Sequence, residues 1–214
     1  MESPQPEPAP LPAAAAPLEA ERQRWNQALL DPQWRASRFN AAPNALLVEA
    51  VAGLPAGSAL DINMGEGRNA LYLAQQGWQV TGVDIADQAL AFARQRAQEL
   101  GVSISTHAQD LQTFDWGRGQ WDLLVLCYAD EQDHARQVAA ALRPGGLVVF
   151  ENFHRDVNQA WGEKLGREIG FTSSELRDRY VQAGFEIVRY EEPVAVADFT
   201  RETQRLVRLL ARRR

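Results

Sequence analysis

The sequence contains few of the residues on which several classes of protein depend. It has one cysteine, so it cannot form an internal disulfide, and Cys127 lies in the apolar run WDLLVLCY, which suits a buried side chain in a reducing compartment. A catalytic thiol is the alternative for this residue. No run approaches the roughly 18 consecutive apolar residues of a membrane-spanning helix. We therefore expect a cytoplasmic protein with no membrane partner.

An excess of basic charge is also missing. The formal net charge is −6 and the isoelectric point is near 5.2, whereas binding to a phosphate backbone relies on basic patches. Nucleic acid is therefore disfavoured as a partner. No cluster of histidine, cysteine and carboxylate residues has the spacing of metal ligands, so we expect no metal. Nothing in the sequence indicates an oligomeric state.

Strand-like and helix-like segments alternate along the chain. Continuous apolar strands such as LLVLCY and LVVF need helices on both faces of their sheet, which predicts a doubly wound α/β fold. We expect a disordered tail at 1–16, a helical segment at 17–43 that Pro32 interrupts, and one domain at 44–214. Strands are predicted at 58–62, 78–85, 102–110, 121–128 and 147–153, with a closing pair within 185–199, and helices at 44–54, 68–76, 86–100, 134–142 and 173–183.

The carboxyl-terminal segment DFTRETQRLVRLLARRR combines leucines with arginines. Its pattern predicts a basic amphipathic helix. Such a helix could bind acidic lipid or RNA, or its arginines could simply complement its own carbonyl end.

A glycine-containing loop, DINMGEG, follows the first predicted strand. Gly65 and Gly67 permit a tight turn and the close approach of a ligand, and Asn63 is the type of non-glycine residue best able to adopt a positive φ. The loop therefore indicates close contact with a ligand. The alternative is a tight strand-to-helix turn.

Two carboxylates extend this pattern. Asp84 ends the second predicted strand, where nucleotide-binding folds place an acidic residue that accepts hydrogen bonds from ribose hydroxyls. Asp110 ends the third and suits an adenine amino group. Neither GxGxxG nor GxxxxGK[ST] is present, which disfavours a dinucleotide and a nucleoside triphosphate. A nucleoside ligand is favoured.

At these residues the sequence resembles the class I S-adenosylmethionine-dependent methyltransferases, whose loop reads roughly D-x-G-x-G-x-G. Asn63 stands at the first glycine of that pattern. The run GEGRNALYLAQQGWQVTGVD is similar to the small methyltransferases of the tellurite-resistance and thiopurine-like group. The resemblance covers about residues 20–212. It implies a Rossmann-like sheet, mostly parallel with an antiparallel carboxyl-terminal strand, S-adenosylmethionine as cofactor, and a small-molecule acceptor that is methylated on oxygen, nitrogen, sulfur or a chalcogen.

The resemblance also implies a cofactor site on the loop and the strand ends. The loop would line the methionine moiety, Asp84 would hold the ribose, and Ile85 would pack on adenine. For Leu111 and Cys127, plain core packing is the alternative. The implied cofactor-binding residues are Asp61, Asn63, Gly65, Gly67, Asn69, Asp84, Ile85, Asp110, Leu111 and Cys127.

Methyl transfer from a sulfonium is an in-line displacement, so a base is needed only if the acceptor arrives protonated. The predicted catalytic residues are Tyr128 and His154, with Asp130 as a further candidate. A surface histidine that caps a loop is the alternative for His154. We expect His134 to be solvated among acidic neighbours and His107 to be structural.

The helical segment before the domain carries Trp25, Trp34, Arg35, Arg38 and Phe39. In the resembling group this region folds over the cofactor, so we expect a lid. A helix that only covers the edge of the sheet is the alternative.

The acceptor itself is not specified by a motif. No NPPY-type tetrapeptide follows the fourth predicted strand, which lowers the case for nucleobase or glutamine-amide acceptors. Two other functions remain open, a non-catalytic regulatory module that binds S-adenosylmethionine or another nucleoside, and, disfavoured by the glycine spacing, a dinucleotide-dependent reductase.

Overall fold

The structure, a computed structural model, describes residues 18–129, 134–158 and 169–214. The predicted tail at 1–16 lies outside these residues. Within them, no helix is both long and apolar enough to cross a membrane.

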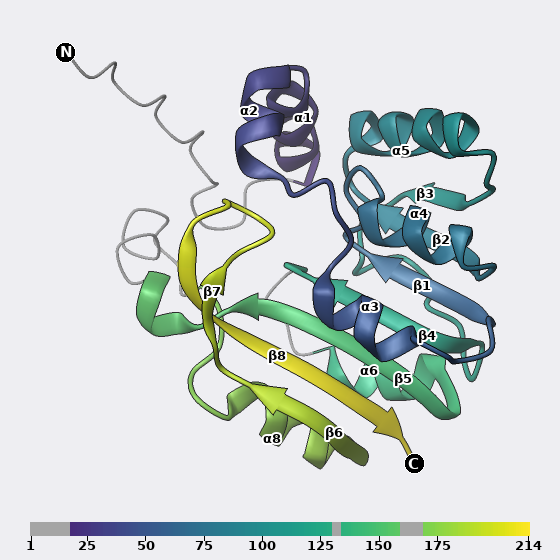
Figure 1. Cartoon of the computed structure of the whole chain (residues 1–214), viewed down its shortest axis with the longest axis vertical. Helices are drawn as coiled ribbons and strands as arrows, with labels where there is room; N and C mark the ends of the chain where they lie inside the picture. The colour runs from purple at the N-terminus through teal and green to yellow at the C-terminus, as the bar shows by residue number, and fades with distance from the viewer. Residues whose placement is uncertain (1–17, 130–133, 159–168) are drawn as a thin grey trace.

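Eight strands of the described chain form one sheet in the order β3-β2-β1-β4-β5-β8-β6, with β7 paired to β8 (Figure 1). The five strands from β3 to β5 are parallel, and β8 runs antiparallel to β5 and to β6. This order confirms the predicted Rossmann-like sheet with an antiparallel carboxyl-terminal strand. The strands are β1 Ser58–Ile62, β2 Gln79–Asp84, β3 Ser105–Ala108, β4 Trp121–Cys127, β5 Leu142–Phe153, β6 Phe185–Glu191, β7 Val194–Val196 and β8 Thr203–Arg213.

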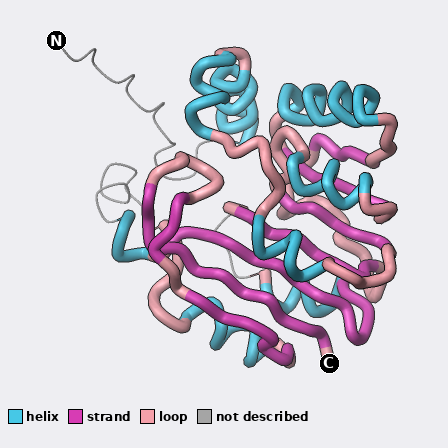
Figure 2. Tube along the Cα trace, in the orientation of Figure 1, coloured by secondary structure: helices cyan, strands magenta, loops and turns pink. Residues whose placement is uncertain are grey.

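Helices cover both faces of the sheet (Figure 2). One apolar layer joins the sheet to α3, α4 and α5, and the other joins it to α6 and α8. The helices of the described residues are α1 Leu18–Leu29, α2 Pro32–Arg38, α3 Ala45–Val51, α4 Arg68–Gln75, α5 Asp87–Leu100, α6 Ala135–Ala141 and α8 Glu175–Gln182, with a 3-10 turn η1 at Arg155–Asn158.

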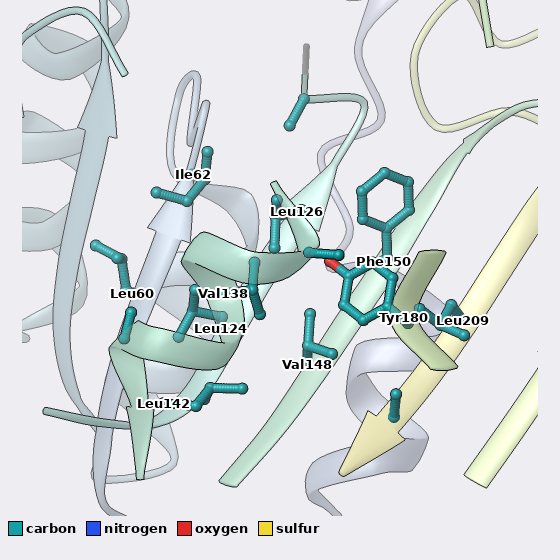
Figure 3. Close-up of a cluster of buried hydrophobic side chains, with 14 of the residues drawn as sticks. Leu60, Ile62, Leu124, Leu126, Val138, Leu142, Val148, Phe150, Tyr180 and Leu209 are labelled. Atoms are coloured by element: carbon teal, nitrogen blue, oxygen red, sulfur yellow. The ribbon is translucent and has the colours of Figure 1, made fainter. Parts of the chain in front are cut away.

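The two apolar layers exist because successive side chains of a strand point to opposite faces. In β4, Leu124 faces the layer under α6 and α8, while Leu123 faces the layer under α3, α4 and α5, and all of these leucines are buried. The strands are therefore apolar on both sides. Figure 3 shows one layer, with Leu60 and Ile62 of β1, Leu124 and Leu126 of β4, Val148 and Phe150 of β5, Val138 of α6 and Tyr180 of α8.

Helix boundaries follow the signals in the sequence. Pro32 opens α2, and the Asp31 carboxylate accepts the N–H groups of Gln33 and Trp34. The Asn44 side chain accepts the N–H of Leu47 at the start of α3.

The carboxyl-terminal segment corrects the sequence analysis, because it forms β8 and not an amphipathic helix. Between β5 and β6 this strand is central, so its leucines meet apolar layers on both faces. Its arginines reach carboxylates at the strand ends, such as Glu151 for Arg208 and Glu192 for Arg205. Pairing with two neighbours therefore outweighs the helical spacing of the leucines.

Candidate functional site

A cavity of about 920 Å³ opens where the strand order reverses, beside the carboxyl ends of β1, β2 and β4. Its walls come from α1, α2, the loop after β1, the residues that follow β2, β3 and β4, and the loop between β7 and β8. Figure 1 shows α1 and α2 at this side of the sheet, away from α6 and α8. The volume is near the upper end of the roughly 300–1,000 Å³ typical of ligand sites.

The loop after β1 exposes backbone to the cavity. Asn63 adopts a φ of 52° and Gly65 a φ of 55°, so asparagine supplies the left-handed geometry that the sequence analysis expected of it. A Cβ built on Gly65 would meet nothing within 4 Å, which leaves open space for a ligand. Gly67 serves packing instead, because a Cβ there would lie 3.0 Å from the Met64 Cε and 3.1 Å from the Ala93 Cβ.

Asp84 lies at the end of β2 and lines the cavity together with Ile85. One carboxylate oxygen accepts the N–H of Gly65 and the other the N–H of Ala86, both at 2.8 Å. Burial raises the pKa of Asp84, and these N–H groups oppose the shift. The loop and the predicted ribose-binding carboxylate are thus tied together.

Asp61 is buried behind the loop, with 2% of its surface exposed, and does not line the cavity. Its Oδ2 atom has no hydrogen-bond partner in the described part of the chain. Burial raises the pKa of Asp61 to about 7, against the opposing charge of Arg68. Asn69 is also buried, and its side chain accepts the N–H of Asn44 at 2.9 Å. Asn69 therefore stabilises the site without lining the cavity.

Three other predicted residues line the cavity, namely Asp110, Leu111 and Cys127. Burial raises the pKa of the Cys127 thiol well above its usual range, so the thiol stays protonated. The nucleophile of a thiol enzyme is the thiolate. The protonated state of the Cys127 thiol therefore gives no support to a catalytic role.

Tyr128 follows β4 with a φ of 59° and lines the cavity. Its hydroxyl donates to Glu151 Oε1 at 2.8 Å and accepts the N–H of Asp198 at 3.0 Å. Burial, and then the carboxylate of Glu151, raise the pKa of the phenol far above neutrality. Tyr128 therefore stays protonated and holds two segments together.

His154 does not reach the cavity, which corrects the expectation that it faces the acceptor. It has 1% of its surface exposed, its Nε2 lies 3.1 Å from the Ser173 Oγ, and its Nδ1 accepts the N–H of Asp156 at 3.2 Å. The polar partners that hold the ring in place, Ser173 and Asp156, do not line the cavity either. Asp130, the further candidate, lies outside the described residues.

His134 is a second correction, because it is buried and not solvated. It precedes α6 with 8% of its surface exposed, and its ring centroid lies 5.3 Å from that of Trp116. It lines the cavity, and its Nε2 has no hydrogen-bond partner among the described residues. The acidic neighbours of His134 in the sequence predict a solvated side chain. Its burial depends on the packing of Trp116 against α6, which the sequence does not indicate. His107 lies on the edge strand β3 beside Phe114.

Two residues that line the cavity were missed in the sequence analysis, Arg68 and Asp198. Their ion pair measures 2.7 Å and is largely buried. Asp198 also accepts hydrogen bonds from Asn40 and Asn44, at 2.8 and 2.9 Å. Arg68 lies in the run GEGRNALYLAQQGWQVTGVD. Nothing in the sequence indicates that it pairs with a residue 130 positions away.

The helical segment docks beside the loop. Arg22 of α1 pairs with Asp87 at 2.6 Å, and Arg35 of α2 pairs with Glu66 of the loop at 3.0 Å. The Arg35 guanidinium also lies over the Phe92 ring, 3.9 Å from its centroid. Of the residues predicted for a lid, Trp25, Arg35 and Phe39 line the cavity, whereas Trp34 and Arg38 do not.

Known proteins are similar to this chain in sequence and in fold. A family model described as a methyltransferase domain matches residues 59–146. An uncharacterized methyltransferase of Synechocystis sp. is 28% identical over 71% of this chain and 76% of that protein. A ubiquinone biosynthesis O-methyltransferase of Idiomarina loihiensis is 34% identical over 51% of this chain and 47% of that enzyme, so the chain spans about half the length of such relatives. The structure of TehB from Haemophilus influenzae has a TM-score of 0.66 at 21% identity, over 78% of this chain and 61% of that one, which is a likeness of fold.

The sheet order is that of the class I methyltransferase fold, and residues 59–146 match a methyltransferase domain. The chain is similar to the S-adenosylmethionine-dependent methyltransferases of this class, as its loop predicted, and S-adenosylmethionine is the cofactor of that class. The site fits that molecule. It offers open space beside the backbone of Gly65 and the carboxylate of Asp84 in the cavity wall.

Proposed function

We propose that this protein transfers a methyl group from S-adenosylmethionine to a small molecule bound under the helical segment 18–43. The observation that carries the proposal is the continuity of the cavity. One cavity joins Gly65 and Asp84 at the strand ends to Trp25 of α1 and Phe199 of the β7–β8 loop. Cofactor and acceptor can therefore occupy neighbouring parts of one cavity.

When bound, S-adenosylmethionine supplies a methyl group on a positively charged sulfur, with a good leaving group already in place. The protein then has to hold the acceptor in line with that methyl and exclude water. Tyr128 stays protonated, and its hydroxyl accepts the N–H of Asp198 in the β7–β8 loop. Helices α1 and α2 form one wall of the cavity. Neither predicted base is needed for this role.

We propose that residues 17–43 act as a lid and that residues 44–214 form the methyltransferase domain. The contacts of Arg22 and Arg35 with α5 and the loop support the lid, because both contacts can break without unfolding the sheet. One buried cysteine and an acidic composition support a cytoplasmic location.

The test is calorimetric titration of the purified protein with S-adenosylhomocysteine, followed by transfer of a labelled methyl group to a panel of phenols, amines and thiols. Wild type should bind and transfer the label. Asp84→Ala should lose about a hundredfold in affinity, because two hydrogen bonds to a charged group are removed. Glu99→Ala, which removes an exposed carboxylate at the far end of α5, is the matched control and should bind normally. Tight binding without transfer would instead favour a regulatory module.

A further inference from the structure

We propose that the acceptor is an uncharged, planar aromatic or heteroaromatic molecule, held between the rings of Trp25, Phe39, Tyr128 and Phe199. This inference rests on the proposed methyl transfer and names the substrate class of the same site. It differs from the chalcogen acceptors that the resemblance to the tellurite-resistance group allows.

The four rings come from four segments and meet around one of them. Phe199 lies 6.2 Å from Trp25, 5.4 Å from Phe39 and 6.3 Å from Tyr128, measured between ring centroids. All four rings line the cavity. Each is half-buried, whereas Phe153, which packs behind Tyr128 and Phe199, is 5% exposed. Ring surface therefore remains open toward the cavity.

Phe199 is held in place by polar contacts on either side of it. The Asp198 N–H donates to Tyr128, and the Asp198 carboxylate pairs with Arg68. The N–H of Thr200 donates to the carbonyl of Arg38 at 2.9 Å, and Phe39 forms a β-bridge with Phe199. The lid and the β7–β8 loop thus form one unit, and the ring between them is preorganised.

Charge at this end of the cavity disfavours an anion. The two arginines that the lid and the loop place there are already paired, Arg35 with Glu66 and Arg68 with Asp198. The third arginine of the lining, Arg96, comes from α5 and from neither the lid nor the loop. An oxyanion would have to displace a carboxylate, whereas a neutral ring would not.

A site lined by four aromatic rings favours a planar ligand. Aromatic pairs prefer offset-stacked or edge-to-face arrangements at centroid distances of about 4.5–7 Å, and they contribute beyond the area they bury. A puckered ring of the same carbon skeleton cannot adopt these arrangements. The site should therefore distinguish flat from saturated rings of equal size.

The test titrates protein saturated with S-adenosylhomocysteine with 2-naphthol, with decahydro-2-naphthol and with tellurite. We expect 2-naphthol to bind at least about tenfold more tightly than its saturated counterpart, from two or more ring pairs. Phe199→Leu should reduce that ratio below about threefold and leave the affinity for S-adenosylhomocysteine unchanged. Phe171→Leu is the matched control, since this buried ring does not line the cavity, and it should keep the ratio.

Equal binding of the two naphthols, tighter binding of tellurite, or a ratio that survives in Phe199→Leu would overturn the inference. Circular dichroism checks each variant, and Phe39→Leu replaces Phe199→Leu if the latter does not fold. If wild type fails to bind S-adenosylhomocysteine, the proposed function is withdrawn. The same titrations of the free protein then still decide whether the rings select a flat ligand.

Discussion

The two ends of the cavity are built in different ways. The cofactor end consists of backbone and carboxylates at strand ends, where Gly65 and Asp84 are 19 positions apart and joined by a hydrogen bond. The acceptor end consists of aromatic side chains from distant segments, with Trp25 and Phe199 in contact across the lid. One end is fixed by the sheet, and the other by contacts between the lid and the β7–β8 loop.

Because of this difference, a variant should be able to lose binding at one end of the cavity and keep it at the other. A change that fills the open space at Gly65 should remove the cofactor and spare the rings, and a change at Tyr128 should weaken acceptor binding and spare the cofactor. The following variants, from the largest expected effect to the smallest, test that separation.

Gly65→Val should weaken binding of S-adenosylhomocysteine more than about a thousandfold. The new side chain would fill the open space at Gly65 and prevent close approach to the backbone. Calorimetry measures the loss, and binding of 2-naphthol should persist.

Gly53→Val is a matched control for this change. Gly53 also has a positive φ, of 75°, and a Cβ there would also meet nothing within 4 Å, but it lies after α3 and outside the cavity lining. Both variants place a β-branched residue at a positive φ, which strains the backbone. If Gly53→Val lost the ligand as well, strain and not occlusion would explain the effect.

The same contrast explains what the sequence could predict. The cofactor end was predicted because its residues lie in one strand-loop-helix-strand unit, whose spacing carries the geometry. At the acceptor end Trp25, Phe39 and Tyr128 were candidates from the sequence, but Asp198 and Phe199 were not, because the pairing of β7 and β8 positions their loop. His154 was misplaced for a related reason, since its position after β5 does not tell on which side of the strand its ring is buried.

Asp61→Asn should make stability less dependent on pH. The ordinary pKa of this carboxyl is 3.8, and burial raises it to about 7. Between these values the unfolded chain is ionised while the native carboxyl stays protonated, so native stability falls as pH rises and levels off above about pH 7. Relative to wild type, the variant should gain about 3 kcal/mol in the free energy of unfolding between pH 5 and pH 8, at 1.36 kcal/mol per pH unit.

Asp122→Asn supplies the opposite case. Partial desolvation opposes the shift, but the Ser58 N–H and the Arg143 guanidinium lower the pKa of Asp122. Its contribution is complete above the ordinary value and should not change between pH 5 and pH 8. Urea unfolding at both pH values measures the two differences. A gain for Asp61→Asn that is equal at both values would mean that Asp61 is ionised in the native protein.

Tyr128→Phe should loosen the acceptor end at a cost of about 1–2 kcal/mol in stability, because the Asp198 N–H loses its acceptor. Binding of 2-naphthol should weaken several-fold as Phe199 loses its anchor. Binding of S-adenosylhomocysteine should change less than about threefold, since that end depends on backbone. A large loss of S-adenosylhomocysteine affinity with intact naphthol binding would reverse the comparison.

Arg35→Ala should speed the dissociation of S-adenosylhomocysteine about three- to tenfold, because one partly buried ion pair and one cation–π contact close the lid over the loop. Stopped-flow measurements at low salt and at 1 M salt give the rates. High salt should reduce the difference between the variant and wild type. Arg38→Ala, on the same helix but outside the cavity lining, should leave the rate unchanged.

Asn63→Gly should have the smallest effect, a change of less than about threefold in the affinity for S-adenosylhomocysteine. Asn63 already adopts the positive φ that the glycine of the family pattern would supply, so the variant alters a side chain and not the path of the loop. Calorimetry beside wild type measures the difference. A tenfold gain would mean that the asparagine side chain occupies part of the methionine pocket, and the cofactor end would then depend on a side chain as much as the acceptor end does.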